Sequence, residues 1–134
     1  MTATQIVADI SSGKLTAEAV MTDHLARINA RDSAVNAFID FDPDRALKLA
    51  RAADRQTKKG ILHGVPFAVK DIIDTLDMPT AWGSPIYANF QSPRNASCVE
   101  MFLLSGAIPI GKTVTTEFAY FSPGPTRNPH NLEH

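Results

Sequence analysis

The chain has 134 residues, of which 44% are hydrophobic and 20% are charged, and its formal net charge is −1. This ordinary globular composition argues against a disordered chain and gives no basic footprint for nucleic acid. The apolar runs are too short to span a bilayer, and the first ten residues lack the features of a signal peptide. The single cysteine, Cys98, excludes an internal disulfide and is interpreted as a small buried residue. We therefore expect a cytoplasmic protein with one domain.

Caps and apolar periods predict the elements of the first sixty residues. They are a short helix after Thr2, a helix from Thr16 to about Ala30, a strand over 35–41 and a helix from Pro43 to about Thr57. Thr2 and Gln5 have the spacing of a capping box, and Asp42-Pro43 is typical of a cap followed by a first-turn proline.

A buried strand that delivers a lysine is predicted over 65–69. Val65, Phe67 and Val69 recur at period two, and Lys70 follows at the end of the strand. Pro66 indicates an edge strand or the first residues of a strand, because proline cannot donate to a ladder.

The second half alternates again between helical and strand patterns. Asn95 is a candidate cap for a helix whose predicted buried stripe contains Cys98, Val99, Phe102 and Leu103. A short strand over 108–110 and a helical turn over 116–119 follow. Alternating helices and strands predict an α/β fold.

Residues 106–113 match the phosphate-loop pattern G-x-x-x-x-G-K-[ST], in which Lys112 would hold phosphates and Thr113 a magnesium ion. That motif needs a strand before the loop and a helix opening after it. Here a predicted helix precedes the motif, and an apolar run with Pro109 occupies the loop. The context therefore favours a strand over a nucleotide site.

Other chemistry-bearing residues do not form a recognisable site. The histidines are His24, His63, His130 and His134, and their spacing with one cysteine does not predict a metal site. Asp71, Asp74 and Asp77 cluster after Lys70 and are interpreted as a solvated loop, in which Asp71 pairs with a neighbour. No serine lies in a G-x-S-x-G elbow.

Three blocks of the sequence, taken together, resemble the amidase signature family. They are residues 64–71, residues 80–84, and residues 105–113 with Glu117-Phe118-Ala119 and Thr126-Arg127-Asn128-Pro129. The resemblance lies in the order and spacing of the blocks, and it accounts for Gly111-Lys112-Thr113 without a nucleotide.

The resemblance implies an α/β fold with a mixed β-sheet flanked by helices, of which this chain is the N-terminal part. Within one domain over 1–134, it implies a helical entry over 1–60, the lysine strand with an α/β segment over 61–120, and a loop tail over 121–134. The implied activity is hydrolysis of a carboxamide to a carboxylic acid and ammonia by a Ser–cis-Ser–Lys triad, with no cofactor and no metal.

Lys70 matches the lysine of that triad, which implies a general base acting on the bridging serine. A lysine is a base only when part of it is neutral, and apolar neighbours such as Phe67 and Val69 would favour the neutral form. The resemblance also implies that Ala119 and Thr126 lie at the substrate pocket. Both serines are expected beyond the 134 residues, so we expect the chain to be inactive by itself.

Two alternatives stay open, an A-subunit-like part of a tRNA-dependent amidotransferase and a non-enzymatic fragment or interaction module. Asn95 stands where the family often has Asp, and Val114 where many members have Asn. These departures favour a general bacterial amidase over the amidotransferase branch. The expected partner is a small-molecule amide, with a second copy of the chain as a further candidate, and neither nucleic acid nor a membrane is expected.

Overall fold

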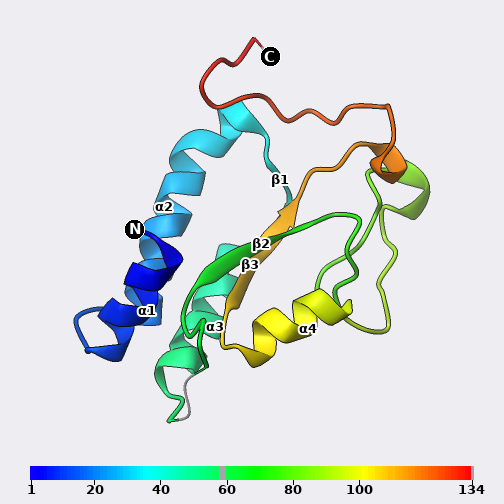
Figure 1. Ribbon diagram of the computed structural model, residues 1–134. Coiled ribbons are helices and arrows are strands. Elements are labelled where there is room, and N and C mark those ends of the chain that lie inside the picture. The colour runs from blue at the N-terminus through cyan, green and yellow to red at the C-terminus, as the bar shows by residue number, and fades with distance from the viewer. Residues whose placement is uncertain (58–59, 134) are drawn as a thin grey trace.

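A computed structural model describes residues 1–57 and 60–133 of the chain. The chain folds into a central sheet with helices on both sides (Figure 1). The elements are α1 (Ala3–Ser11), α2 (Ala17–Val35), β1 (Phe38–Phe41), α3 (Pro43–Asp54), β2 (Pro66–Lys70), the 3₁₀ turn η1 (Pro85–Tyr87), α4 (Ser97–Leu104), β3 (Ile108–Thr113) and the 3₁₀ turn η2 (Glu117–Ala119). The predicted α/β class is confirmed. In this part of the chain no helix is both long and apolar enough to cross a membrane.

The sheet has the order β1-β3-β2, with β3 in the centre. β1 pairs with β3 in antiparallel orientation. β2 pairs with β3 in parallel orientation, and the crossover connection between them contains α4. β2 is an edge strand that begins at Pro66, as the proline predicted. In the parallel register Val69 lies beside Lys112 and Lys70 beside Thr113. The two lysines therefore lie on neighbouring strands at the same end of the sheet.

Two apolar clusters hold the layers together. The first joins α1, α2 and α3 to Val65, Ile108 and Ile110, and the second joins α4 to β2 through Val69, Met78 and Val99. In Figure 1, α1 and α2 lie to the left of the strands and α4 to the right. The strand that carries Lys70 packs into the second cluster through Phe67 and Val69.

The predicted helix starts are confirmed in α1, α2 and α3. Thr2 and Gln5 form the full capping box, and Thr16 and Asp42 each accept a hydrogen bond from the backbone of their own first turn.

The predicted helix ends are less accurate. α2 continues past Ala30 to Val35 because no breaker precedes Asn36, which adopts a left-handed conformation with φ 54°. The strand predicted over 35–41 consequently begins only at Phe38, and α3 ends at Asp54 rather than Thr57.

Two predictions for α4 are wrong. Its N-cap is Ala96, while the side chain of Asn95 accepts from the backbone N–H of Leu76 and donates to Glu100. Cys98 is exposed rather than buried, and Phe102 is 43% exposed. The helix is apolar on most of its faces, so its periodicity could not show which face packs on the sheet.

A matched pair of substitutions tests the packing of the first cluster. Met21 in α2 is fully buried, whereas Met101 in α4 is 68% exposed. Met21→Ala should lower the free energy of unfolding by about 2–5 kcal/mol through the cavity it leaves. Met101→Ala should change it by no more than about 0.5 kcal/mol. Urea unfolding measures both, and equal losses would contradict the assignment of the core.

Candidate functional site

Lys70 is the last residue of the edge strand β2, and its side chain is exposed. Its backbone is fixed on the C-terminal side, since Ile73 donates its N–H to the Lys70 carbonyl at 2.9 Å and Asp71 donates to Thr113 at 2.9 Å. Phe67 and Val69 do not surround the ammonium group as the sequence suggested, because both pack into the second cluster. The lysine is held in place by its main chain.

Asp71, the next residue, is buried and organises the loop that follows. Its carboxylate accepts hydrogen bonds from the backbone N–H of Ala81 at 3.0 Å and of Gly83 at 3.2 Å. Its main-chain carbonyl accepts a third from Trp82 at 3.0 Å. The loop over 71–83 is therefore closed back onto its own first residue rather than being a solvated acidic loop.

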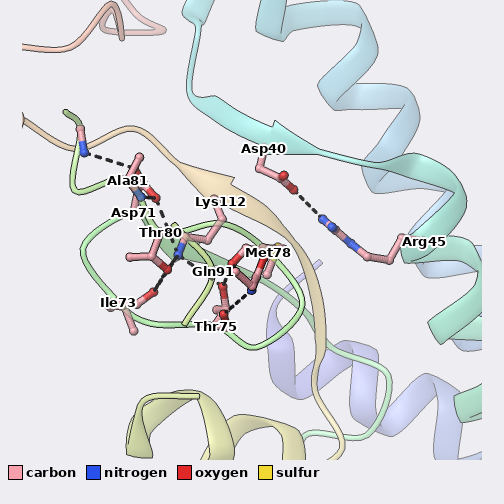
Figure 2. Close-up of polar contacts among 11 residues, drawn as sticks. Asp40, Arg45, Asp71, Ile73, Thr75, Met78, Thr80, Ala81, Gln91 and Lys112 are labelled. Carbon is pink, nitrogen blue, oxygen red and sulfur yellow. Dashed lines mark hydrogen bonds and ion pairs between the residues drawn. The ribbon is translucent and has the colours of Figure 1, made fainter. Parts of the chain in front are cut away.

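Lys112 fills the inside of this loop from the central strand, with 0% of its surface exposed (Figure 2). Its Nζ donates to the Ile73 carbonyl at 2.7 Å and to Thr80 Oγ1 at 2.8 Å, and lies 3.4 Å from Thr75 Oγ1. The Asp71 carboxylate lies 3.7 Å from the same nitrogen. Three acceptors and one counter-ion match the three protons and single charge of an ammonium group.

The hydroxyl groups around Lys112 are oriented to accept. Thr75 donates its own proton to the Met78 carbonyl at 2.8 Å, which leaves its lone pairs for Lys112. The side-chain amide of Gln91 lies within 3.2 Å of the carbonyls of Thr75 and Met78 and closes the loop from outside. Burial lowers the pKa of Lys112 from its ordinary 10.5, and the nearby carboxylates, Asp71 foremost, oppose that change.

Ala119, expected at the substrate pocket, is exposed in η2 and has a left-handed backbone with φ 58°. Phe118 before it has φ 49° and donates its N–H to the Trp82 carbonyl at 2.8 Å. Trp82 itself has φ 51° and donates to Asp71. Trp82 thus connects the η2 turn to the residue after Lys70. The left-handed backbone of these non-glycine residues is a conformation that concentrates at functional sites.

Thr126, the other expected pocket residue, is held at a different place. Its hydroxyl donates to the Asn36 carbonyl at 2.7 Å, and Arg127 donates its N–H to Val35 at 2.8 Å. The tail therefore passes over the C-terminal end of α2 (Figure 1). The described contacts tie Ala119 to the neighbourhood of Lys70, whereas those of Thr126 attach it to α2.

A mainly apolar pocket of about 440 Å³ opens between the ends of β1 and β3 and the 81–88 loop. Its lining includes Phe38, Ala81, Gly83, Ser84 and Val114. Within the described residues no three His, Cys, Asp or Glu side chains converge as metal ligands, and His134 lies outside those residues.

The phosphate-loop pattern matches in sequence, but the segment does not form a phosphate-binding loop. Gly111, Lys112 and Thr113 belong to β3, and the lysine is buried beneath the 71–83 loop instead of facing a ligand. Sequence reasoning considered only phosphate binding as chemistry for Lys112 and did not predict that its ammonium group is buried inside the 71–83 loop. The signal that could have found it is the pair of threonines, Thr75 and Thr80, that follow Asp71.

Residues 19–134 match the family model described as Amidase. Among curated relatives, the A subunit of glutamyl-tRNA(Gln) amidotransferase from Streptomyces coelicolor is 42% identical over 98% of this chain and 29% of its own. Its counterpart from Chloroflexus aurantiacus is 41% identical over 89% of this chain and 25% of its own. The solved peptide amidase of Stenotrophomonas maltophilia superposes with a TM-score of 0.91 at 31% identity, over 100% of this chain and 31% of its own.

The chain therefore spans less than a third of the length of these relatives. The curated relatives named here are amidotransferase A subunits, whereas Asn95 and Val114 led to the expectation of a general bacterial amidase. Asn95 bridges the Leu76 N–H and Glu100, and Val114 donates its N–H to Ala37. Neither set of contacts involves Lys70.

A double-mutant cycle measures the buried charge pair. Lys112→Met leaves the Asp71 carboxylate buried without its counter-ion and should cost about 3–5 kcal/mol of unfolding free energy. Adding Asp71→Asn removes the uncompensated charge and should recover part of that loss. Denaturant unfolding of the four proteins provides the cycle, and strictly additive losses would contradict a direct interaction.

The pH dependence of stability tests the lowered pKa of Lys112. Between that pKa and 10.5 the unfolded chain binds more protons at this lysine than the folded chain. The free energy of unfolding of the wild type should therefore rise with pH in this window relative to Lys112→Met. Urea unfolding at a series of alkaline pH values measures the difference, and parallel curves would show that burial does not disfavour the charge.

Proposed function

Because the chain belongs to the amidase signature family, we propose that it is the N-terminal part of an enzyme that cleaves carboxamide C–N bonds, with Lys70 as general base. The observation that carries the proposal is the position of Lys70. It ends a strand inside the matched region, its main chain is fixed on the C-terminal side, and the residue is exposed. An exposed amine on a fixed backbone is suited to meet groups supplied by the rest of the enzyme.

The proposed chemistry is acyl transfer through a serine. Neutral Lys70 takes a proton from the bridging serine, which takes one from the nucleophilic serine. The nucleophile forms a C–O bond with the amide carbonyl carbon, the C–N bond breaks, and the nitrogen leaves as ammonia after accepting the proton. Water then hydrolyses the acyl-enzyme. Both serines lie outside the 134 residues in this proposal, so the chain alone should show no turnover.

The identities of 41–42% to the glutamyl-tRNA(Gln) amidotransferases favour a more specific candidate, the A subunit of a tRNA-dependent amidotransferase. In that role the ammonia formed from the amide would be passed on to an acceptor on tRNA. A free amidase acting on a small amide is the second candidate, supported by the 0.91 TM-score to the peptide amidase. A cytoplasmic location is part of the same proposal.

Chimaeric enzymes test the role of Lys70. Residues 1–134 replace the matching part of the Streptomyces coelicolor amidotransferase, and ammonia release from an amide is measured. Lys70→Ala should lower kcat by roughly 10²–10⁴-fold, the usual contribution of a general base. Lys48→Ala, at an exposed position of α3, is the matched control and should keep the activity of the parent chimaera. Equal activity of both variants would contradict the proposal.

A second chimaera separates the two candidates. The same 134 residues are joined to the remainder of the peptide amidase of Stenotrophomonas maltophilia. If the chain belongs to the amidotransferase branch, the amidotransferase host should retain the larger fraction of its own activity. A larger fraction in the peptide amidase host would support the free amidase instead.

A further inference from the structure

We propose that Lys112 is a positioning residue for Lys70, acting through the loop over 71–83. The inference rests on the proposed function, because it concerns the placement of the base in that reaction. Lys112 does not touch the substrate in this proposal. It fixes the main chain from which Lys70 projects.

The first connection runs through one residue, Ile73. Lys112 Nζ donates to the Ile73 carbonyl at 2.7 Å, and the Ile73 N–H donates to the Lys70 carbonyl at 2.9 Å. Two hydrogen bonds therefore join the buried ammonium group to the backbone of the catalytic lysine. A shift of Ile73 would move the turn that ends β2.

The second connection runs through Asp71. Its carboxylate lies 3.7 Å from Lys112 Nζ, and its N–H donates to the carbonyl of Thr113, the residue after Lys112 in β3. The same carboxylate holds the N–H groups of Ala81 and Gly83. The residue that follows Lys70 is thus fixed by its side chain and its main chain at once.

The chemistry of the site argues against a purely structural role. A buried ammonium group is costly to desolvate, and replacing a whole buried ion pair by apolar residues of similar volume is often neutral or stabilising. Lys112 nevertheless directs every described polar contact of its side chain to residues 71–80, the segment directly after Lys70. A buried charge whose contacts all go to one loop is explained if that loop must hold a base in position. A shift of about 1 Å in a catalytic group can lower the rate roughly 10²-fold.

Hydrogen exchange in the 134-residue chain tests the physical connection. In Lys112→Met the amide protons of Asp71, Ile73 and Gly83 should exchange about tenfold faster or more, as expected for lost local protection. Amide protons of the first cluster, such as that of Leu25, should change much less. Lys48→Met is the matched control and should leave all of them unchanged. A uniform increase over the whole chain would overturn the proposal in favour of general stabilisation.

Thr80→Val is a milder variant that tests the same connection if Lys112→Met does not fold. It removes one acceptor of the ammonium group, at 2.8 Å, while preserving the shape of the side chain and the charge of Lys112. The same three amide protons should exchange faster, by a smaller factor than in Lys112→Met. Unchanged exchange in Thr80→Val would overturn the proposal.

Kinetics of the amidotransferase chimaera test the consequence for catalysis. Lys112→Met should lower kcat by roughly 10²-fold with KM nearly unchanged, because a misplaced base still allows substrate to bind. A residue that only stabilised the fold would leave kcat per folded molecule unchanged well below the melting temperature. Loss of activity in Lys70→Ala with full kcat in Lys112→Met would overturn the positioning role alone. Full activity in Lys70→Ala would overturn the proposed function, and the positioning role with it.

Discussion

The burial of one ammonium group is the constraint on which this end of the molecule depends. Lys112 projects from the central strand into an interior that excludes water, where an unpaired charge would cost several kcal/mol. The chain meets this requirement with groups from a single loop, the carbonyl of Ile73, the hydroxyls of Thr75 and Thr80, and the carboxylate of Asp71. Because these groups must converge on one nitrogen, the loop has little freedom, and the turn that carries Lys70 shares its restriction.

The same constraint connects the strands to the left-handed backbone nearby. Asp71 receives the N–H groups of Ala81, Trp82 and Gly83, and Trp82 receives that of Phe118 in η2. The restraint that the Lys112–Asp71 pair imposes on the backbone therefore extends through Trp82 to the exposed turn that contains Ala119. In the proposed enzyme this arrangement would give a rigid frame to the base and to one side of its surroundings, while both serines come from elsewhere. Rigidity supplied by supporting groups is what a catalytic constellation requires.

Local sequence signals predicted most of the fold because they act over a few residues. The capping box of Thr2, the cap of Thr16 and the edge position indicated by Pro66 all follow from backbone chemistry, and the structure confirms them. The errors come from tertiary context. The buried face of α4 depends on what it packs against, and the exposure of Cys98 could not be inferred from an almost uniformly apolar helix. The burial of Lys112 could not be predicted for the same reason, since its hydrogen-bond partners lie more than thirty residues away in sequence.

The structure requires Lys112 to be a buried, hydrogen-bonded ammonium group. A ¹H–¹⁵N correlation spectrum of the chain with ¹⁵N-labelled lysine side chains tests it most directly. Protected ammonium protons should give a signal that is absent in Lys112→Met and shows nuclear Overhauser contacts to Thr80 and Ile73. If the ammonium protons of Lys112 exchange with water as fast as those of the exposed lysines, the loop is not closed around this group, and the account of how Lys70 is held is wrong.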